Sequence, residues 1–146
     1  MVGLTLVLCV FWHKIMFMRL PLTIIAIFIG LSGYAQYSLT FCEDVAQGGK
    51  PVTESRVFMV DQSGGVMKML LKADEKITAP NVEYRVIYID DDGSETEVTR
   101  MRQKVEATWN YVWKEVVFYD PGAYKVKVYS DKGTYLTSAN LTIKKQ

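Results

Sequence analysis

Histidine and cysteine are scarce in this chain, which has one histidine and two cysteines among 146 residues. His13 and Cys9 both lie in the first 35 residues, so residues 36–146 contain no histidine and one cysteine, Cys42. A single cysteine cannot form an internal disulfide. The lack of histidine excludes Ser-His and Cys-His nucleophilic pairs. It also excludes the usual zinc sites, which draw on histidine or several cysteines.

An excess of charge of either sign is also absent. Lys14 and Arg19 precede residue 36, so residues 36–146 keep 15 of the 17 basic residues and all 16 acidic ones, a net charge of −1. A nearly neutral domain has no long-range field that attracts nucleic acid or an acidic membrane. The glycine pairs at 48–49 and 64–65 lack the Lys-Ser/Thr and helix of a phosphate loop. We therefore expect no nucleic-acid partner and no cofactor.

Apolar residues concentrate at the N-terminus, where residues 1–35 have the layout of a signal segment. Met18-Arg19 supplies a short positive region, residues 20–31 form the apolar stretch, and Gly33-Tyr34-Ala35 offers the small-x-small pattern of a cleavage site. An uncleaved anchor helix is the alternative, but it needs about 20 unbroken apolar residues, and Pro21 interrupts this shorter run. We predict cleavage after Ala35.

Residues 1–17 precede this signal and are themselves apolar. They are either a long leading region or the product of a misassigned start, and we favour the second because Met16 and Met18 lie where a normal signal begins. The sequence thus predicts an exported protein of the periplasm, outer surface or extracellular space. It would meet a membrane only through the signal during export, and its mature part would be a single domain, 36–146.

The mature part alternates apolar and polar residues with a period of two, the pattern of half-buried strands. Turn signals such as Asp91-Asp92-Gly93-Ser94 and Asp131-Lys132-Gly133 separate the runs. The expected strands cover residues 37–43, 56–60, 66–73, 82–89, 95–105, 109–119, 124–129 and 135–143. We therefore predict an all-β fold, a sandwich or barrel of seven to eight short antiparallel strands.

One local motif favours the sandwich. Residues 120–126, Asp-Pro-Gly-Ala-Tyr-Lys-Val, resemble the D-x-G-x-Y-x-C stretch that enters strand F of immunoglobulin-like domains. The resemblance implies that Tyr124 is a tyrosine corner, whose hydroxyl bonds to nearby backbone. Val126 stands where antibody-type domains have their second disulfide cysteine, so the resemblance implies an immunoglobulin-like sandwich outside the antibody type.

The wider pattern is similar to small exported β-sandwich proteins of Bacteroidetes-type bacteria. The resemblance rests on residues 41–45, 49–52, Phe58, 64–65 and 121–129. It implies an envelope or secreted location and no particular activity.

Two charged clusters are candidate sites. Asp90, Asp92 and Glu95, with neighbouring acids, offer oxygen ligands for calcium, but their spacing does not match an EF-hand loop. We favour a solvated hairpin tip. The alternating basic residues from Arg100 through Arg102 to Lys104 would suit a polyanion. We favour an exposed strand whose charges prevent aggregation.

Trp109, Tyr111 and Trp113 share one face of a predicted strand. Exposed, they would form an aromatic platform for sugars or peptides. Buried, they would belong to the sandwich core, as tryptophan does in immunoglobulin-like folds. We expect burial, with Asn110, Val112 and Lys114 on the solvent side.

The combined pattern predicts a non-enzymatic binding or adhesion-type module of the cell envelope, with an unknown protein or glycan as its partner. The alternatives are a carbohydrate-binding module that uses the aromatic face and a structural envelope subunit that associates through an open sheet edge. Cys42 is expected to be a free, buried thiol, and Tyr124 to have a structural role.

Overall fold

The computed structural model describes residues 36–146, so the predicted signal segment and its cleavage after Ala35 lie outside it. These residues form nine strands and no helix that could cross a membrane. The strands are β1 Tyr37–Ala46, β2 Lys50–Glu54, β3 Val57–Val60, β4 Gly65–Ala73, β5 Asn81–Ile89, β6 Glu95–Lys104, β7 Tyr111–Phe118, β8 Gly122–Ser130 and β9 Tyr135–Lys145.

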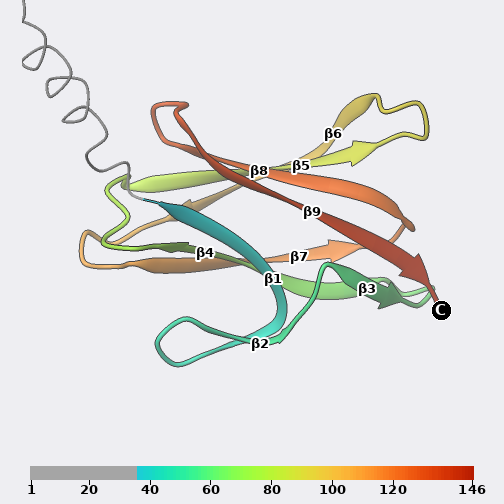
Figure 1. The fold of residues 1–146 in the computed structure, drawn as a ribbon, viewed down its shortest axis with the longest axis horizontal. Coiled ribbons are helices and arrows are strands. Elements are labelled where there is room, and N and C mark those ends of the chain that lie inside the picture. Colours follow the sequence, from blue (N-terminus) through green and yellow to red (C-terminus); the bar gives the residue numbers. More distant parts are fainter. Residues whose placement is uncertain (1–35) are drawn as a thin grey trace, which may run out of the picture. The chain divides into compact units, whose positions relative to one another are not determined.

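Two sheets pack face to face (Figure 1). Sheet A has the strand order β2-β1-β4-β7, and sheet B has the order β3-β9-β8-β5-β6. All neighbouring strands are antiparallel except β3 and β9, which run parallel. The N-terminal part of the chain therefore contributes to both sheets, β1 and β2 to sheet A and β3 to sheet B.

The expected count of seven to eight antiparallel strands was wrong in two respects. There are nine strands, because residues 50–54, which lie between the expected strands 37–43 and 56–60, form β2. Proline lacks an N–H but is tolerated at a sheet edge, and Pro51 lies in β2, at the edge of sheet A. Thr53 has a φ of 54°, so the strand is also locally irregular. The second difference is the parallel β3–β9 pair.

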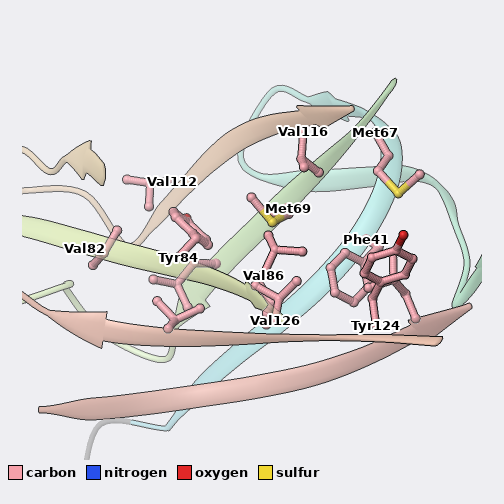
Figure 2. Packing of buried hydrophobic residues seen from close by; sticks show 14 of the residues in the cluster. Phe41, Met67, Met69, Val82, Tyr84, Val86, Val112, Val116, Tyr124 and Val126 are labelled. Carbon is pink, nitrogen blue, oxygen red and sulfur yellow. The ribbon is translucent and has the colours of Figure 1, made fainter. Parts of the chain in front are cut away.

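The core lies between the sheets and follows the predicted alternation (Figure 2). Met67, Met69 and Leu71 of β4 face Val82, Tyr84 and other side chains of sheet B, and all five are at most 1% exposed. Burying alternate side chains of both sheets supplies the main free energy of folding, roughly 25 cal/mol for each Å² of apolar surface.

Tyr124 lies near the start of β8 and forms the predicted corner. Its hydroxyl donates to the backbone carbonyl of Asp120 at 3.0 Å. Its ring packs edge-on against Phe118 and Tyr88, with centroids 4.8 and 5.2 Å away. The corner, the two sheets and the strand order together confirm the immunoglobulin-like β-sandwich.

Replacing Tyr124 with phenylalanine should lower the free energy of unfolding by about 0.5–1.5 kcal/mol. The substitution keeps the ring in its aromatic cluster and removes only the hydroxyl bond to Asp120. Urea denaturation measures the change. An unaltered midpoint and slope would show that the corner does not stabilise this turn.

Tyr84→Phe should have the opposite sign. Tyr84 is 0% exposed, and its hydroxyl has no hydrogen-bond partner among the residues that the structure describes. A buried hydroxyl without a partner carries a desolvation cost of about 1–3 kcal/mol. We expect phenylalanine to raise the free energy of unfolding by about 1 kcal/mol. A loss of stability in the same urea titration would mean that the hydroxyl is bonded in solution.

Candidate binding edge

The structure reverses the predicted faces of β7. Val112, Val116 and Phe118 point into the core, whereas Trp113 is 40% exposed and Trp109, just before the strand, is 43% exposed. Tyr111 is half-buried. The expectation of burial, which required at least one of the two tryptophans to lie in the core, was therefore wrong. Ring size favours burial of the aromatic residues, but Val112 and Val116 occupy the positions of β7 that face sheet B.

The three aromatic residues line an open groove of about 870 Å³ beside β7. The lining also includes Gln103 of β6, Thr108 from the segment before β7, and Lys114 and Glu115 of β7. A second hollow of about 510 Å³ continues from Glu115 between β6 and the C-terminal half of β7. The side of the sandwich between β6 and β7 is thus open.

β7 is an edge strand, because it pairs with β4 alone. The carbonyl of Asn110 accepts from the amide of Ala73 at 2.8 Å, which fixes the phase of the β4–β7 ladder. Since inward and outward backbone groups alternate along an antiparallel strand, the N–H and C=O groups that face the open edge belong to Tyr111, Trp113, Glu115 and Val117. The residues with exposed side chains thus also carry the unpaired backbone groups.

Trp113 is supported from β4. The ammonium of Lys68 lies 4.4 Å from the centroid of the Trp113 ring, close enough for a cation–π contact. Lys68 also forms an ion pair with Asp44 of β1, and this hydrogen bond lowers the pKa of the Asp44 carboxyl. The contacts fix the ring while leaving part of it accessible.

Tyr111 is supported by the turn between β1 and β2. A Cβ on Gly49 would lie 2.6 Å from the Tyr111 ring, so the turn packs directly on it. Gly49 also has a φ of +71°, which favours glycine. The hairpin β1–β2 therefore crosses the outer face of sheet A, the face opposite the core (Figure 1).

The acidic candidates do not converge on a metal site. Asp92 accepts from the backbone N–H of Ser94 at 2.8 Å, and Asp90 from its hydroxyl at 3.2 Å. Glu95 turns to the ammonium groups of Lys125 and Lys127, whose hydrogen bonds lower its pKa to about 2. Within residues 36–146 no three acidic, histidine or cysteine side chains are placed to hold a metal ion.

The basic candidates are neutralised by acids. Glu83 on β5 accepts from Arg102 at 3.2 Å and from Arg85 at 2.8 Å, and it lies 3.8 Å from Arg100. The hydrogen bond from Arg85 is the main cause of the lowered pKa of Glu83. Lys104 pairs with Glu106 at 3.3 Å. Arg100, Arg102 and Lys104 thus form ion pairs on an exposed strand. The exposure of this strand is what the sequence predicted.

Cys42 is buried and free, as predicted. Neighbouring side chains of a strand point to opposite faces, and Phe41 faces the core, so Cys42 faces the outer side of sheet A. There its thiol contacts the carbonyl of Lys68 at 3.8 Å. Burial raises the pKa of the Cys42 thiol above its ordinary value. A thiol that is buried and protonated reacts slowly.

Thiol labelling of Cys42 should accordingly be slow in the native protein and fast in denaturant. Mass spectrometry after timed exposure to a maleimide measures both rates. Rapid labelling of the native protein would show that the hairpin β1–β2 opens readily.

Comparisons with known proteins find a distant likeness of fold. An immunoglobulin-like protein of Pseudomonas aeruginosa matches at 10% identity and a TM-score of 0.49, over 79% of this chain and 100% of that chain. The soluble domain of PmoD from Methylocystis matches at 16% identity and a TM-score of 0.46, over 76% of this chain and 93% of that domain. AlkC, an alkylpurine DNA glycosylase of Pseudomonas fluorescens, matches at 15% identity and a TM-score of 0.39. The match covers 73% of this chain and 30% of AlkC.

No family model and no curated protein matches the chain. The three similar structures come from Pseudomonas and Methylocystis, so the expected resemblance to proteins of Bacteroidetes-type bacteria stays a prediction. At these identities and TM-scores the likenesses carry no argument about activity.

Proposed function

We propose that this domain is an exported, non-enzymatic protein-binding module that recognises an extended polypeptide along β7. One observation carries the proposal: the backbone groups that face the open edge belong to residues whose side chains, Tyr111, Trp113 and Val117, offer apolar surface. An added strand uses free N–H and C=O groups for affinity and alternate side chains for specificity. Exposed tryptophans are also typical hot spots of protein interfaces.

The chemistry of the groove supports binding over catalysis. Lys114 and Glu115 are adjacent on β7, so their side chains point to opposite faces of sheet A. They are therefore not placed to work together as a general acid and base. The rest of the lining is mainly aromatic, amide and hydroxyl, which suits recognition.

Export rests on the signal pattern ahead of Gln36. Intact-mass analysis of the protein recovered outside the cytoplasm should give a chain that begins at Gln36. Retention of residues 18–35 in that product would contradict cleavage after Ala35.

The proposal is tested by recovering partners from the envelope of the producing cells with the domain 36–146. Trp113→Ala should reduce capture about 30-fold or more, the scale of a hot-spot loss. Val57→Ala changes a comparably exposed apolar residue, 47% exposed on β3, and should leave capture unchanged. Equal capture by both variants would remove β7 from recognition.

Glycan binding is the second candidate. Trp109 and Trp113 expose ring surface on a groove that also presents Gln103, Thr108 and Asn110, which can bond sugar hydroxyls. A glycan array separates the two functions when combined with Glu115→Pro. Proline removes an outward backbone N–H and should abolish strand addition, while ring stacking on Trp109 and Trp113 should persist.

A further inference from the structure

The four edges of the two sheets differ in how open they are to another strand. In sheet A, β2 carries Pro51 and the irregular Thr53. In sheet B, β3 has only four residues, and β6 carries alternating charges that include Arg100 and Arg102. Prolines, short strands and charges are devices that blunt sheet edges. β7 has eight residues and neither proline nor glycine, so it is the edge left open to pairing.

We propose that the occupant of this edge is a second copy of the same chain, with the two β7 strands antiparallel about a two-fold axis at Trp113. The proposal rests on the proposed function and names its partner. Under this two-fold axis, the outward N–H groups of each copy face the outward C=O groups of the other. The backbone of β7 can therefore form an antiparallel ladder with a second β7. The two sheets A would join into one eight-stranded sheet.

Charge disfavours two of the possible registers, and the exposed ring of Trp113 favours a third, in which that ring is covered. An axis at position 114 would oppose Lys114 to its own copy, and an axis at 115 would oppose Glu115 to its own copy. Like charges directly opposite each other destabilise a strand pair. An axis at 113 opposes the two Trp113 rings and avoids both conflicts. The axis at 113 also lets the backbone groups bond, because residues 111, 113 and 115 all direct their N–H and C=O groups to the open edge.

The same register matches the remaining side chains. Tyr111 lies opposite Glu115 of the second copy, and each half of the junction repeats this pair. Lys114 on the core-facing side lies opposite Val112 of the second copy, where its aliphatic stem can cover apolar surface. Trp109 reaches Val117 of the second copy, and these residues are 43% and 40% exposed in the single chain. Because β7 begins at Tyr111, the paired segments are residues 111–115 of each copy, and the contact of Trp109 with Val117 extends the covered apolar surface beyond them.

Sedimentation or light scattering over a concentration series tests the association of residues 36–146. We expect a dimer that dissociates on dilution. Trp113→Lys places two ammonium groups at the axis, and Glu115→Pro removes an outward N–H; both should be monomers. Val57→Lys, on the β3 edge, should remain a dimer. Circular dichroism and a cooperative unfolding transition confirm that each variant is folded, which we expect because edge strands tolerate proline at outward positions.

Cysteine cross-linking tests the register in a Cys42→Ala background. Opposite residues of a hydrogen-bonded pair have Cα atoms about 5.5 Å apart, within disulfide range. The double variant Tyr111→Cys/Glu115→Cys should therefore form a covalent dimer on oxidation, and each single variant should not. A disulfide in Glu115→Cys alone would place the axis at position 115 and overturn the register.

The outcomes separate this inference from the proposed function. A wild-type domain that stays monomeric at every concentration overturns the second copy as occupant. If that monomer still captures another protein in a Trp113-dependent way, or a glycan, the edge binds something else. If it captures nothing through β7, both proposals fail.

Discussion

Phe41→Ala is expected to lower the free energy of unfolding by about 3–5 kcal/mol, enough to unfold much of a small domain. Phe41 is 1% exposed and projects from β1 into the core (Figure 2). Trp113→Ala removes a larger ring but should cost only about 1–2 kcal/mol, because 40% of the side chain is already in water. Urea denaturation followed by circular dichroism compares the two variants without depending on tryptophan emission.

The contrast tests which face of β7 is buried. If Trp113→Ala were as destabilising as Phe41→Ala, the ring would be a core element and the proposed binding edge would have no exposed anchor. Quenching of tryptophan emission in the domain 36–146, which contains only Trp109 and Trp113, gives an independent measure. Both residues should be accessible to the quencher.

Leu70→Ala is the second substitution with a large expected effect, about 2–5 kcal/mol. Leu70 is 0% exposed although it lies between Met69 and Leu71, which face the core. Its side chain is therefore buried on the outer face of sheet A, beside Trp113 in the β4–β7 ladder and on the face that the hairpin β1–β2 crosses.

Val117→Ala supplies the control for Leu70→Ala. Val117 lies on the same outer face but is 40% exposed, so its truncation should change stability by less than about 0.5 kcal/mol. A small effect of Leu70→Ala would mean that the outer face collapses around the cavity or that the hairpin contributes little. Chemical denaturation of both variants decides this.

Sequence reasoning recovered most of the fold because alternation with a period of two depends on local geometry. The strands from β4 to β9 lie where the alternation predicted them, and Tyr124 makes the expected hydroxyl bond. The hairpin β1–β2 was missed because Gly48, Gly49 and Pro51 are turn residues in most contexts. Gly48 and Gly49 do form a turn, but Pro51 lies in an edge strand that depends on pairing with β1, which a local pattern does not encode.

The sequence pointed to the right aromatic residues as a candidate site, but it predicted the wrong side of the strand for them. Alternation correctly put Trp109, Tyr111 and Trp113 on one side, but ring size was a poor guide to which side is buried. The run Leu70-Leu71 in β4 held a usable signal: consecutive apolar residues indicate a strand covered on both faces. A covering hairpin on the outer face of sheet A follows from that reasoning, and the aromatic residues beside it could have been assigned to the outer face.

The parallel pair β3–β9 has a consequence for the order of folding. Val57 to Val60 pair with Thr142 to Lys145, so strands near the two ends of the domain must meet. During synthesis, β3 is made early and has no partner in sheet B until β9, the last of the described strands, has followed. Contacts between such distant segments carry a large loop-closure entropy and slow folding. Sheet B therefore stays incomplete until nearly the whole domain has been synthesised.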